Sequence, residues 1–223
     1  MSAIETSTLE AYEHWAPIYP PVAHNPLMRA EQHAMLQVLP DMEGGRVLDL
    51  ACGSGRYSHL LRKANAAQVV ALDFCPAMLE QVAGAGRVRA SMMQLPFRSA
   101  AFDAVVCGLA VGHATDLHQW MFEAARVLRP EGNLVYSDFH SDAIRAGMTR
   151  SFKDADDVTW TVPHQVYDLS RQREAMAAAG LTVETVRELR MGMELNEPFP
   201  GSERAYRQWY GVPVVLIVRA CKK

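Results

Sequence analysis

Short apolar runs alternate with helical patterns along most of the chain after residue 45. Runs rich in Val, Leu and Ala predict strands at 46–50, 69–73, 88–90, 102–107 and 133–138. Apolar residues at helical spacing predict helices between them at 57–64, 76–82 and 117–128, with a turn at 129–132. Strands that alternate with helices are typical of a parallel sheet with helices on both faces. The pattern therefore predicts an α/β fold.

The alternation stops after residue 138 and resumes near the C-terminus. Residues 139–167 hold few apolar runs, which predicts a loop with irregular helix. Beyond them the pattern predicts a helix at 169–179 that ends at Gly180, a strand at 181–189, a long connection over 190–211 and a last strand at 212–220.

The first 40 residues precede the sheet and differ from it in pattern. Only residues 27–38 have clear helical spacing, and the aromatic residues Tyr12, Trp15 and Tyr19 lie outside any regular core pattern. Such residues suit a layer packed over the carboxyl edge of the sheet, where open α/β sheets bind ligands. We therefore expect residues 1–40 to form an N-terminal cap over a binding site.

Composition narrows the possible partners. The 223 residues are 49% hydrophobic and carry a net charge of -3, which fits one globular domain over 1–223 and argues against a nucleic-acid surface. The longest apolar stretch, 212–218, contains Pro213 and is far shorter than the roughly 20 residues of a membrane helix. Residues 1–20 show no secretory signal, so we expect a cytoplasmic protein without membrane insertion. The sequence carries no signal of oligomeric state.

Metal and disulfide chemistry find little support in the sequence. The four cysteines and eight histidines are scattered without the spacing of a zinc site, which predicts buried thiols in a reducing compartment. The acidic group of Asp154, Asp156 and Asp157 is typical of a solvated polar segment. We expect no metal.

The strongest chemical signal is the segment 47–55, an apolar strand that runs into a glycine-rich turn before a helix. Gly53 and Gly55 permit close ligand approach, and the helix behind them presents free N–H groups. Asp73 follows 20 residues after Gly53, where an acid can accept both hydroxyls of a ribose. Two ligand classes fit this arrangement, dinucleotides and S-adenosylmethionine.

Two residues distinguish these ligands. A dinucleotide fingerprint would place a third glycine where this chain has Ser58. Asp49, beside the turn, opposes a pyrophosphate but suits the ammonium group of a methionine moiety. The residues favour the sulfonium cofactor over a nicotinamide dinucleotide and its reductase chemistry.

Five motifs then resemble one family in order and spacing. They are Asp49–Gly55, Ala71–Leu79, Gln94–Phe97, Phe102–Val106 and Ala125–Gly132. They resemble the class I S-adenosylmethionine-dependent methyltransferases, in particular the group with malonyl-carrier-protein O-methyltransferases of biotin synthesis and ubiquinone/menaquinone C-methyltransferases. The resemblance runs from about Tyr12 to Gly132. It implies a Rossmann-like three-layer sandwich with a mostly parallel seven-stranded sheet, an antiparallel last strand and an N-terminal helical cap.

The resemblance also implies roles for individual residues at the S-adenosyl-L-methionine site. The residues expected at its methionine end are Asp49, Ala51, Gly53 and Gly55. Asp73 would bind the ribose, and Phe74 would pack on the adenine. The family usually has an Asp after the third strand, where this chain has Ser91, so the Met92 backbone would contact the adenine edge instead. The family has an N-terminal element that covers the sulfonium, and it is matched here by Tyr12, Ala16 and Tyr19. Aromatic rings would attract the positive charge of the sulfonium.

Acceptor residues are expected after the fourth and fifth strands. His113 and His140 follow those strands and are the candidate catalytic residues, because a hydroxyl or carbon acceptor needs a base. A carboxylate acceptor would need none. His164 and Tyr167 are further candidates, and 139–168 and 190–211 are the expected acceptor-side segments.

The predicted reaction is methyl transfer to a small-molecule or carrier-bound acceptor, with oxygen favoured as the accepting atom. Methyl transfer to carbon or nitrogen stays open. So does a cofactor-binding protein that transfers no methyl group. The cofactor motifs cannot separate these alternatives, because fold and cofactor do not determine the acceptor.

Overall fold

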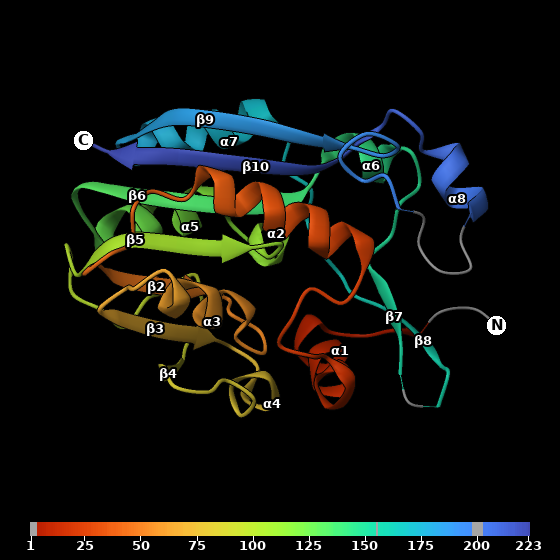
Figure 1. Ribbon diagram of the computed structural model, residues 1–223, viewed down its shortest axis with the longest axis horizontal. Helices are drawn as coiled ribbons and strands as arrows, with labels where there is room; N and C mark the ends of the chain where they lie inside the picture. The colour runs from red at the N-terminus through yellow and green to blue at the C-terminus, as the bar shows by residue number, and fades with distance from the viewer. Residues whose placement is uncertain (1–3, 155, 198–202) are drawn as a thin grey trace.

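The computed structural model describes residues 4–154, 156–197 and 203–223. Its centre is a seven-stranded sheet in which β10 alone runs against its neighbours β6 and β9 (Figure 1). In spatial order the strands are β4 (Gly86–Arg89), β3 (Gln68–Asp73), β2 (Arg46–Leu50), β5 (Phe102–Gly108), β6 (Leu128–Phe139), β10 (Pro213–Lys222) and β9 (Leu181–Arg190). Because the order reverses between β2 and β5, a crevice opens at the carboxyl ends of these strands.

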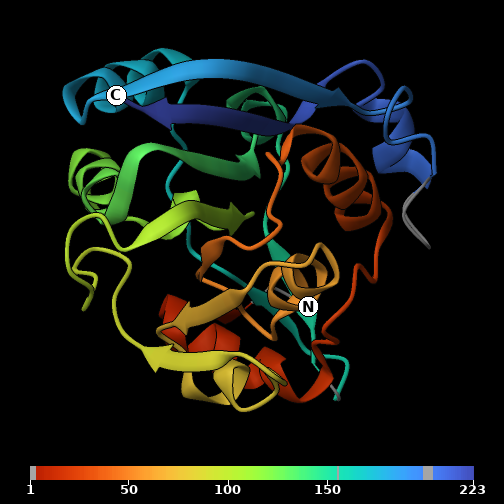
Figure 2. The same cartoon turned by 60° about the vertical axis from the view of Figure 1, so that its left-hand side comes forward.

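Helices cover both faces of the sheet. One face packs against α5 (Leu117–Val127) and α7 (Leu169–Ala178), and the other against α2 (Pro26–Val38) and α3 (Arg56–Lys63). In Figure 2 the green helix α5 and the orange helix α2 lie on opposite sides of the sheet. Successive residues of β2 point to opposite faces, so Val47 joins the α2 side and Leu48 the α5 side. The expected three-layer α/β sandwich is confirmed.

Four further α-helices lie around these layers among the described residues. They are α1 (Thr8–Trp15), α4 (Pro76–Leu79), α6 (Ser141–Arg145) and α8 (Glu203–Gln208). The side chain of Ser7 caps α1 by accepting the Glu10 N–H, and α2 begins with an Asn25 cap and Pro26 in its first turn. These caps explain why both N-terminal helices begin where they do.

A second, three-stranded sheet stands beside the carboxyl ends of the parallel strands (Figure 1). It consists of β1 (Ile4–Glu5), β8 (Thr159–Thr161) and β7 (Ser151–Lys153), so residues 4–5 pair with a strand from the segment after β6. Ala11 of α1 packs against Phe152 and Val162 in a small apolar cluster of its own. The predicted N-terminal helical element is present, and the small sheet connects the segment before α1 to β7 and β8.

Several boundaries differ from the sequence predictions. The loop predicted over 139–167 contains α6 and the two strands of the small sheet, which are too short and polar for a pattern to reveal. The turn predicted at 129–132 lies inside β6, whose register against β5 shifts there and whose Glu131 has φ 65°. The connection over 190–211 includes α8, and its residues 198–202 lie outside the described residues.

No helix among the described residues is long and apolar enough to cross a membrane.

Candidate active site

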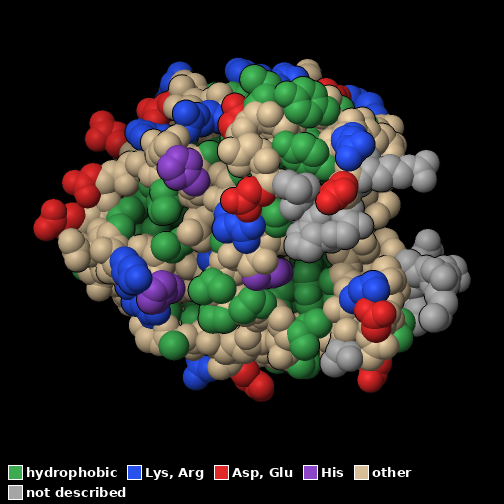
Figure 3. Space-filling view, turned by 45° about the vertical axis from the view of Figure 1, so that its right-hand side comes forward, with side chains coloured by type: hydrophobic (Ala, Val, Ile, Leu, Met, Phe, Trp, Pro, Cys, Tyr) green, Lys and Arg blue, Asp and Glu red, His purple; other side chains and the backbone are tan. Residues whose placement is uncertain are grey.

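A cavity of about 1040 Å³ opens at the carboxyl edge of the sheet, between the glycine turn and the cap. Its floor comes from the ends of β2, β3 and β5, and its cover from α1 and β7. In Figure 3, the face seen there is hollowed, and hydrophobic side chains lie in and below the hollow with charged and His side chains beside it. Ligand pockets usually measure roughly 300–1,000 Å³. The volume therefore suits a cofactor together with a second molecule.

The glycine turn after β2 has the backbone that the sequence predicts. Ala51, Gly53 and Gly55 all have positive φ, at 54°, 54° and 90°. A Cβ added at Gly53 would meet no atom within 4 Å, because the residue faces the open cavity. Gly55 does not line the cavity. It caps α3, and a Cβ there would come within 3.1 Å of Val82, so its part is to shape the turn.

Asp49 lies under this turn with its carboxylate turned to the cavity. It is 1% exposed, and its Oδ2 accepts a hydrogen bond of 2.6 Å from the Ser58 hydroxyl. Burial raises the pKa of Asp49 from its usual value to about 6, against the lowering effect of Ser58 and Arg56. A cationic ligand group beside it would restore the charged form. The arrangement fits the ammonium group of a methionine moiety.

Asp73 connects the turn to the next strand. Its carboxylate accepts the Gly53 N–H at 2.8 Å and the Cys75 N–H at 2.9 Å, which holds both loops in place. Burial nevertheless raises its pKa. Phe74 stands beside it at the mouth of the cavity, 52% exposed, with the Arg89 guanidinium 5.8 Å from its ring centroid. An adenine ring would cover this exposed aromatic face.

Ser91 and Met92 line the cavity beyond β4, on the same side as Phe74. The Ser91 hydroxyl accepts the Met93 N–H at 3.1 Å and so stabilises the turn that presents the Met92 backbone. The sequence-predicted cofactor residues other than Gly55 thus all line the cavity.

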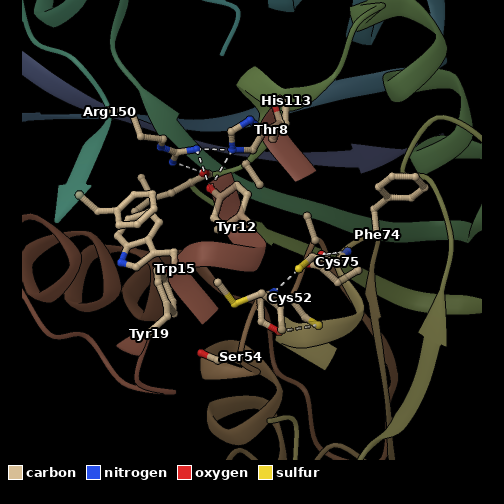
Figure 4. A pocket seen from close by; sticks show the side chains of 18 of the residues that line it. Thr8, Tyr12, Trp15, Tyr19, Cys52, Ser54, Phe74, Cys75, His113 and Arg150 are labelled. Atoms are coloured by element: carbon tan, nitrogen blue, oxygen red, sulfur yellow. Dashed lines mark hydrogen bonds between the residues drawn. The ribbon is translucent and has the colours of Figure 1, made fainter. Parts of the chain in front are cut away.

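The opposite end of the cavity holds a cluster of three polar side chains, Tyr12, His113 and Arg150 (Figure 4). The Tyr12 hydroxyl lies 2.9 Å from His113 Nε2 and accepts a hydrogen bond of 3.3 Å from Arg150. Arg150 also contacts His113 Nε2 and donates to the Leu109 carbonyl. The three residues come from α1, from the loop after β5 and from the segment before β7. We call them the acceptor cluster.

Charge in the acceptor cluster is unbalanced. Burial and the neighbouring Arg150 lower the pKa of His113 well below its usual value, so the imidazole is neutral. Arg150 is only 8% exposed, and no carboxylate oxygen of a described side chain lies within 4 Å of its nitrogens. Asp138, at the end of β6, interacts with the positive charge of Arg150 only from farther away. The cluster therefore presents a buried cation to the cavity.

Arg56, the other buried guanidinium that lines this cavity, is paired with a carboxylate. It is 7% exposed, and Glu31 of α2 accepts its hydrogen bond at 2.8 Å. Glu31 also accepts hydrogen bonds from the Tyr57 and Ser137 hydroxyls, at 2.8 and 2.5 Å. Neutralised in this way, Arg56 supports the floor and needs no ligand charge.

Aromatic rings line the space between the acceptor cluster and the mouth. Trp15 stacks on Phe152, with ring centroids 4.4 Å apart and planes 3° apart, and Tyr19 meets Trp15 edge-on at 4.8 Å. Phe139 and Trp209 line the cavity as well. These rings form an apolar wall on the acceptor side of the cavity, beside the positive charge of Arg150.

The second catalytic candidate, His140, lies elsewhere. Its Nδ1 accepts the Asp142 N–H at 3.1 Å and caps α6, and its Nε2 is 3.5 Å from Glu188. It is not among the residues that line the cavity. The strand-end position predicted an acceptor-facing residue, but the chain turns into α6 immediately after β6. We therefore correct the sequence reading: the structure places His140 in a helix cap.

Two further candidates also lie outside the cavity lining. His164 is half-buried behind Gly112, and the Tyr167 hydroxyl donates to the Ala114 carbonyl at 2.7 Å. The sequence reading missed Arg150 and Phe152 as individual residues. Its only signal for them was the irregular segment in which they lie.

The described residues contain no group of three or more His, Cys, Asp or Glu side chains that could hold a metal ion. The open space at Gly53, the buried carboxylates of Asp49 and Asp73 and the exposed ring of Phe74 fit the parts of S-adenosylmethionine in order. The donor set of the cavity thus suits an organic cofactor.

Comparison with known proteins agrees with this geometry. A methyltransferase domain family model matches residues 48–136. A malonyl-[acyl-carrier protein] O-methyltransferase from Enterobacter lignolyticus is 32% identical over 85% of this chain and 72% of its own length. A demethylmenaquinone methyltransferase from Clavibacter sepedonicus is 35% identical over 50% of this chain and 48% of its own length.

A solved structure supports the fold independently. The S-adenosylmethionine-dependent methyltransferase from Mesorhizobium loti superposes with a TM-score of 0.70 at 21% identity, over 86% of this chain and 98% of its own. Sheet order, glycine turn and cavity, together with the family match over β2 to β6, lead to one assignment: the chain belongs to the class I S-adenosylmethionine-dependent methyltransferases.

Proposed function

We propose that this enzyme transfers the methyl group to an oxygen atom of a small-molecule or carrier-bound acceptor that lies against the acceptor cluster. The observation that carries the proposal is the set of hydrogen-bond donors at that end of the cavity, led by the buried Arg150. A guanidinium has donors only and a permanent positive charge. It attracts an oxygen-bearing group and repels a protonated amine, which favours oxygen over nitrogen.

The contacts of His113 also favour oxygen over carbon as the accepting atom, because they leave the residue unable to act as a base. A carbon acceptor needs a base that removes a proton, and a neutral imidazole has the right form. However, His113 Nε2 already contacts Tyr12 and Arg150, so its lone pair is occupied. We assign His113 the part of a residue that orients the other two members of the cluster.

Positioning supplies most of the catalysis in this proposal. The cofactor, when bound, supplies a methyl group that is already activated. Alignment of an acceptor with it can lower the barrier by roughly 7 to 11 kcal/mol. Tyr12 and Tyr19 lie at the inner face of the cap, where they would exclude water and face the sulfonium with aromatic rings.

Product analysis tests the proposal. The enzyme is incubated with methyl-labelled cofactor and a panel of phenols, carboxylic acids, amines, quinols and a malonyl thioester on carrier protein. We expect label in an ester or ether. Esters release labelled methanol in alkali, and mass spectrometry locates the methyl group in the others. Label found only on carbon or nitrogen would refute oxygen transfer, and cofactor binding without transfer to any acceptor would favour a non-transferring protein.

Calorimetry with two variants tests whether cofactor binding and methyl transfer depend on different residues. Asp73→Ala should weaken binding of S-adenosylhomocysteine, because the variant loses the ribose acceptor and the bond that holds Gly53. His113→Ala should leave that affinity almost unchanged and lower turnover. Equal loss of binding in both variants would contradict the division of roles.

A further inference from the structure

One charge on the acceptor side of the cavity, that of Arg150, has no carboxylate oxygen within 4 Å among the described residues, and Asp138 acts on it only from farther away. Of the two buried guanidinium groups that line the cavity, Arg56 pairs with Glu31 at 2.8 Å. Arg150 has only neutral partners among the described residues, namely Tyr12, His113 and the Leu109 carbonyl. A buried charge without a counter-ion is costly, so its retention beside a binding cavity calls for an anion from the ligand.

The position of Arg150 separates it from the cofactor half of the site. Its guanidinium lies 4.8 Å from the ring centroid of Phe139, at the end of β6, and donates to Leu109, after β5. The glycine turn follows β2, and Asp73 ends β3. Because the sheet order is β3-β2-β5-β6, Arg150 sits on the side away from the ribose and adenine positions. The missing anion therefore belongs to the acceptor.

The walls around this charge are flat and apolar. The ring of Phe152, two residues after Arg150, stacks on Trp15, which Tyr19 meets edge-on, and the ring of Phe139 lies 4.8 Å from the Arg150 guanidinium. Such rings bind another flat ring by offset or edge-to-face packing. A short polar acyl group would leave most of this surface uncovered.

The outer surface of the cap bears little positive charge. Helix α1 carries Glu10 and Glu13 and no Lys or Arg. Lys153, at the edge of the cavity, is already paired with Asp157 at 2.7 Å. In Figure 3, acidic and basic side chains are interspersed on this face. An acidic macromolecular partner would find no basic surface there, which favours a free small molecule.

We infer that the acceptor is a free aromatic carboxylic acid, bound as its carboxylate by Arg150 and by its ring against Trp15 and Phe152. The inference rests on the proposed oxygen transfer and names its substrate class. One carboxylate oxygen takes the guanidinium, and the other forms the new bond to the methyl carbon. The carbon–sulfur bond breaks, and its electron pair stays on sulfur, which becomes a neutral thioether. The acceptor has already lost its proton, so no base is needed.

A carboxylate fits better than a phosphate. The cavity offers one guanidinium and apolar rings around it, whereas a phosphate monoester brings nearly two charges at neutral pH. The neutral imidazole of His113 adds no second positive charge. The single charge of a carboxylate balances Arg150.

The decisive experiment measures binding to enzyme saturated with S-adenosylhomocysteine, using 2-naphthoate and its neutral amide as probes. We expect the acid to bind about 10- to 100-fold more tightly than the amide, because charge-assisted hydrogen bonds are worth about 1.5–3 kcal/mol. Arg150→Gln should abolish this preference and leave S-adenosylhomocysteine affinity unchanged. Arg145→Gln is the matched control, because that arginine is exposed on α6 and pairs with Asp142.

Several results would overturn the inference. Equal binding of acid and amide, no binding of either, or a preference that survives Arg150→Gln would each exclude the carboxylate site. Loss of S-adenosylhomocysteine affinity in Arg150→Gln, with the fold intact by circular dichroism, would assign the residue to the cofactor. If acetate binds as tightly as naphthoate, the acceptor does not need an aromatic ring, and that part of the inference is wrong.

A second readout separates this inference from the proposed function. With methyl-labelled cofactor, the wild type should convert 2-naphthoate to an ester that releases labelled methanol in alkali, and Arg150→Gln should raise KM more than it lowers kcat. Oxygen transfer to neutral phenols but not to the acid would refute the inference alone. Transfer only to carbon or nitrogen would refute the proposed function itself.

Discussion

Replacement of Asp138 by Asn isolates the cost of one buried charge. Asp138 is 4% exposed at the end of β6, and its Oδ1 has no hydrogen-bond partner among the described residues. Burial raises its pKa from 3.8 to about 6, although Arg150 and the Gly112 N–H act in the opposite direction. Asn has the same shape and can still accept the Gly112 N–H. The variant therefore removes the charge and keeps the packing.

The sign and size follow from the pKa. Between pH 3.8 and about 6 the folded state binds the proton more tightly than the unfolded state, so stability falls as the pH rises through this window. At about 1.4 kcal/mol per pKa unit, the ionised carboxylate costs about 3 kcal/mol at pH 8 and about 1 kcal/mol at pH 4.5. Asp138→Asn should therefore stabilise the protein, and more strongly at pH 8.

Urea unfolding at the two pH values measures this difference directly. Asp138→Asn should raise the free energy of unfolding by about 2 kcal/mol more at pH 8 than at pH 4.5. Glu174→Gln, at an exposed position of α7, serves as control and should change stability equally at both pH values. If Asp138→Asn instead destabilises the protein equally at both, the carboxylate is compensated by contacts and the reasoning fails.

Three further substitutions test other parts of the structure. Glu31→Gln leaves Arg56 without its counter-ion and should cost about 3–5 kcal/mol in urea unfolding, and a loss below 1 kcal/mol would show that the pair is not needed. Gly112→Ala would place a Cβ 2.6 Å from the Gln165 carbonyl and should cost about 1–3 kcal/mol in stability and lower turnover, since His113 follows directly. Gly86→Ala, where a Cβ meets nothing within 4 Å, is its control. Phe152→Ala should raise acceptor KM and leave S-adenosylhomocysteine affinity unchanged by calorimetry, and a weaker cofactor affinity would contradict its acceptor-side placement.

The cofactor half of the site could be predicted from the sequence because its residues are local to one repeated unit. A strand, a turn and a helix place Gly53 beside the next strand end, and the parallel pairing of β2 with β3 brings Asp73 to it. Each step depends on a pattern of strands and turns within about 30 residues. The prediction of methyl transfer came instead from the resemblance of five motifs to a known family, because these residues alone indicate only the cofactor.

The acceptor half could be predicted only as segments. His113 and His140 both follow a strand, yet one reaches the cavity and the other caps α6, because the direction of the chain after each strand differs. Arg150 lies in a stretch without hydrophobic period. Its importance depends on Tyr12, which is 138 residues away and reaches it only through the cap.

The fold class and the cofactor could be inferred from the amino-acid sequence alone, because they depend on the periodicity of strands and helices and on the glycine turn, which are local patterns. Which end of the cavity carries an unbalanced charge became visible only in the folded protein. Folding brings Tyr12, His113 and Arg150 together from three remote segments, and no carboxylate oxygen of a described side chain lies within 4 Å of the guanidinium. Charge balance at a buried site is a property of distances, and distances between remote segments arise only on folding.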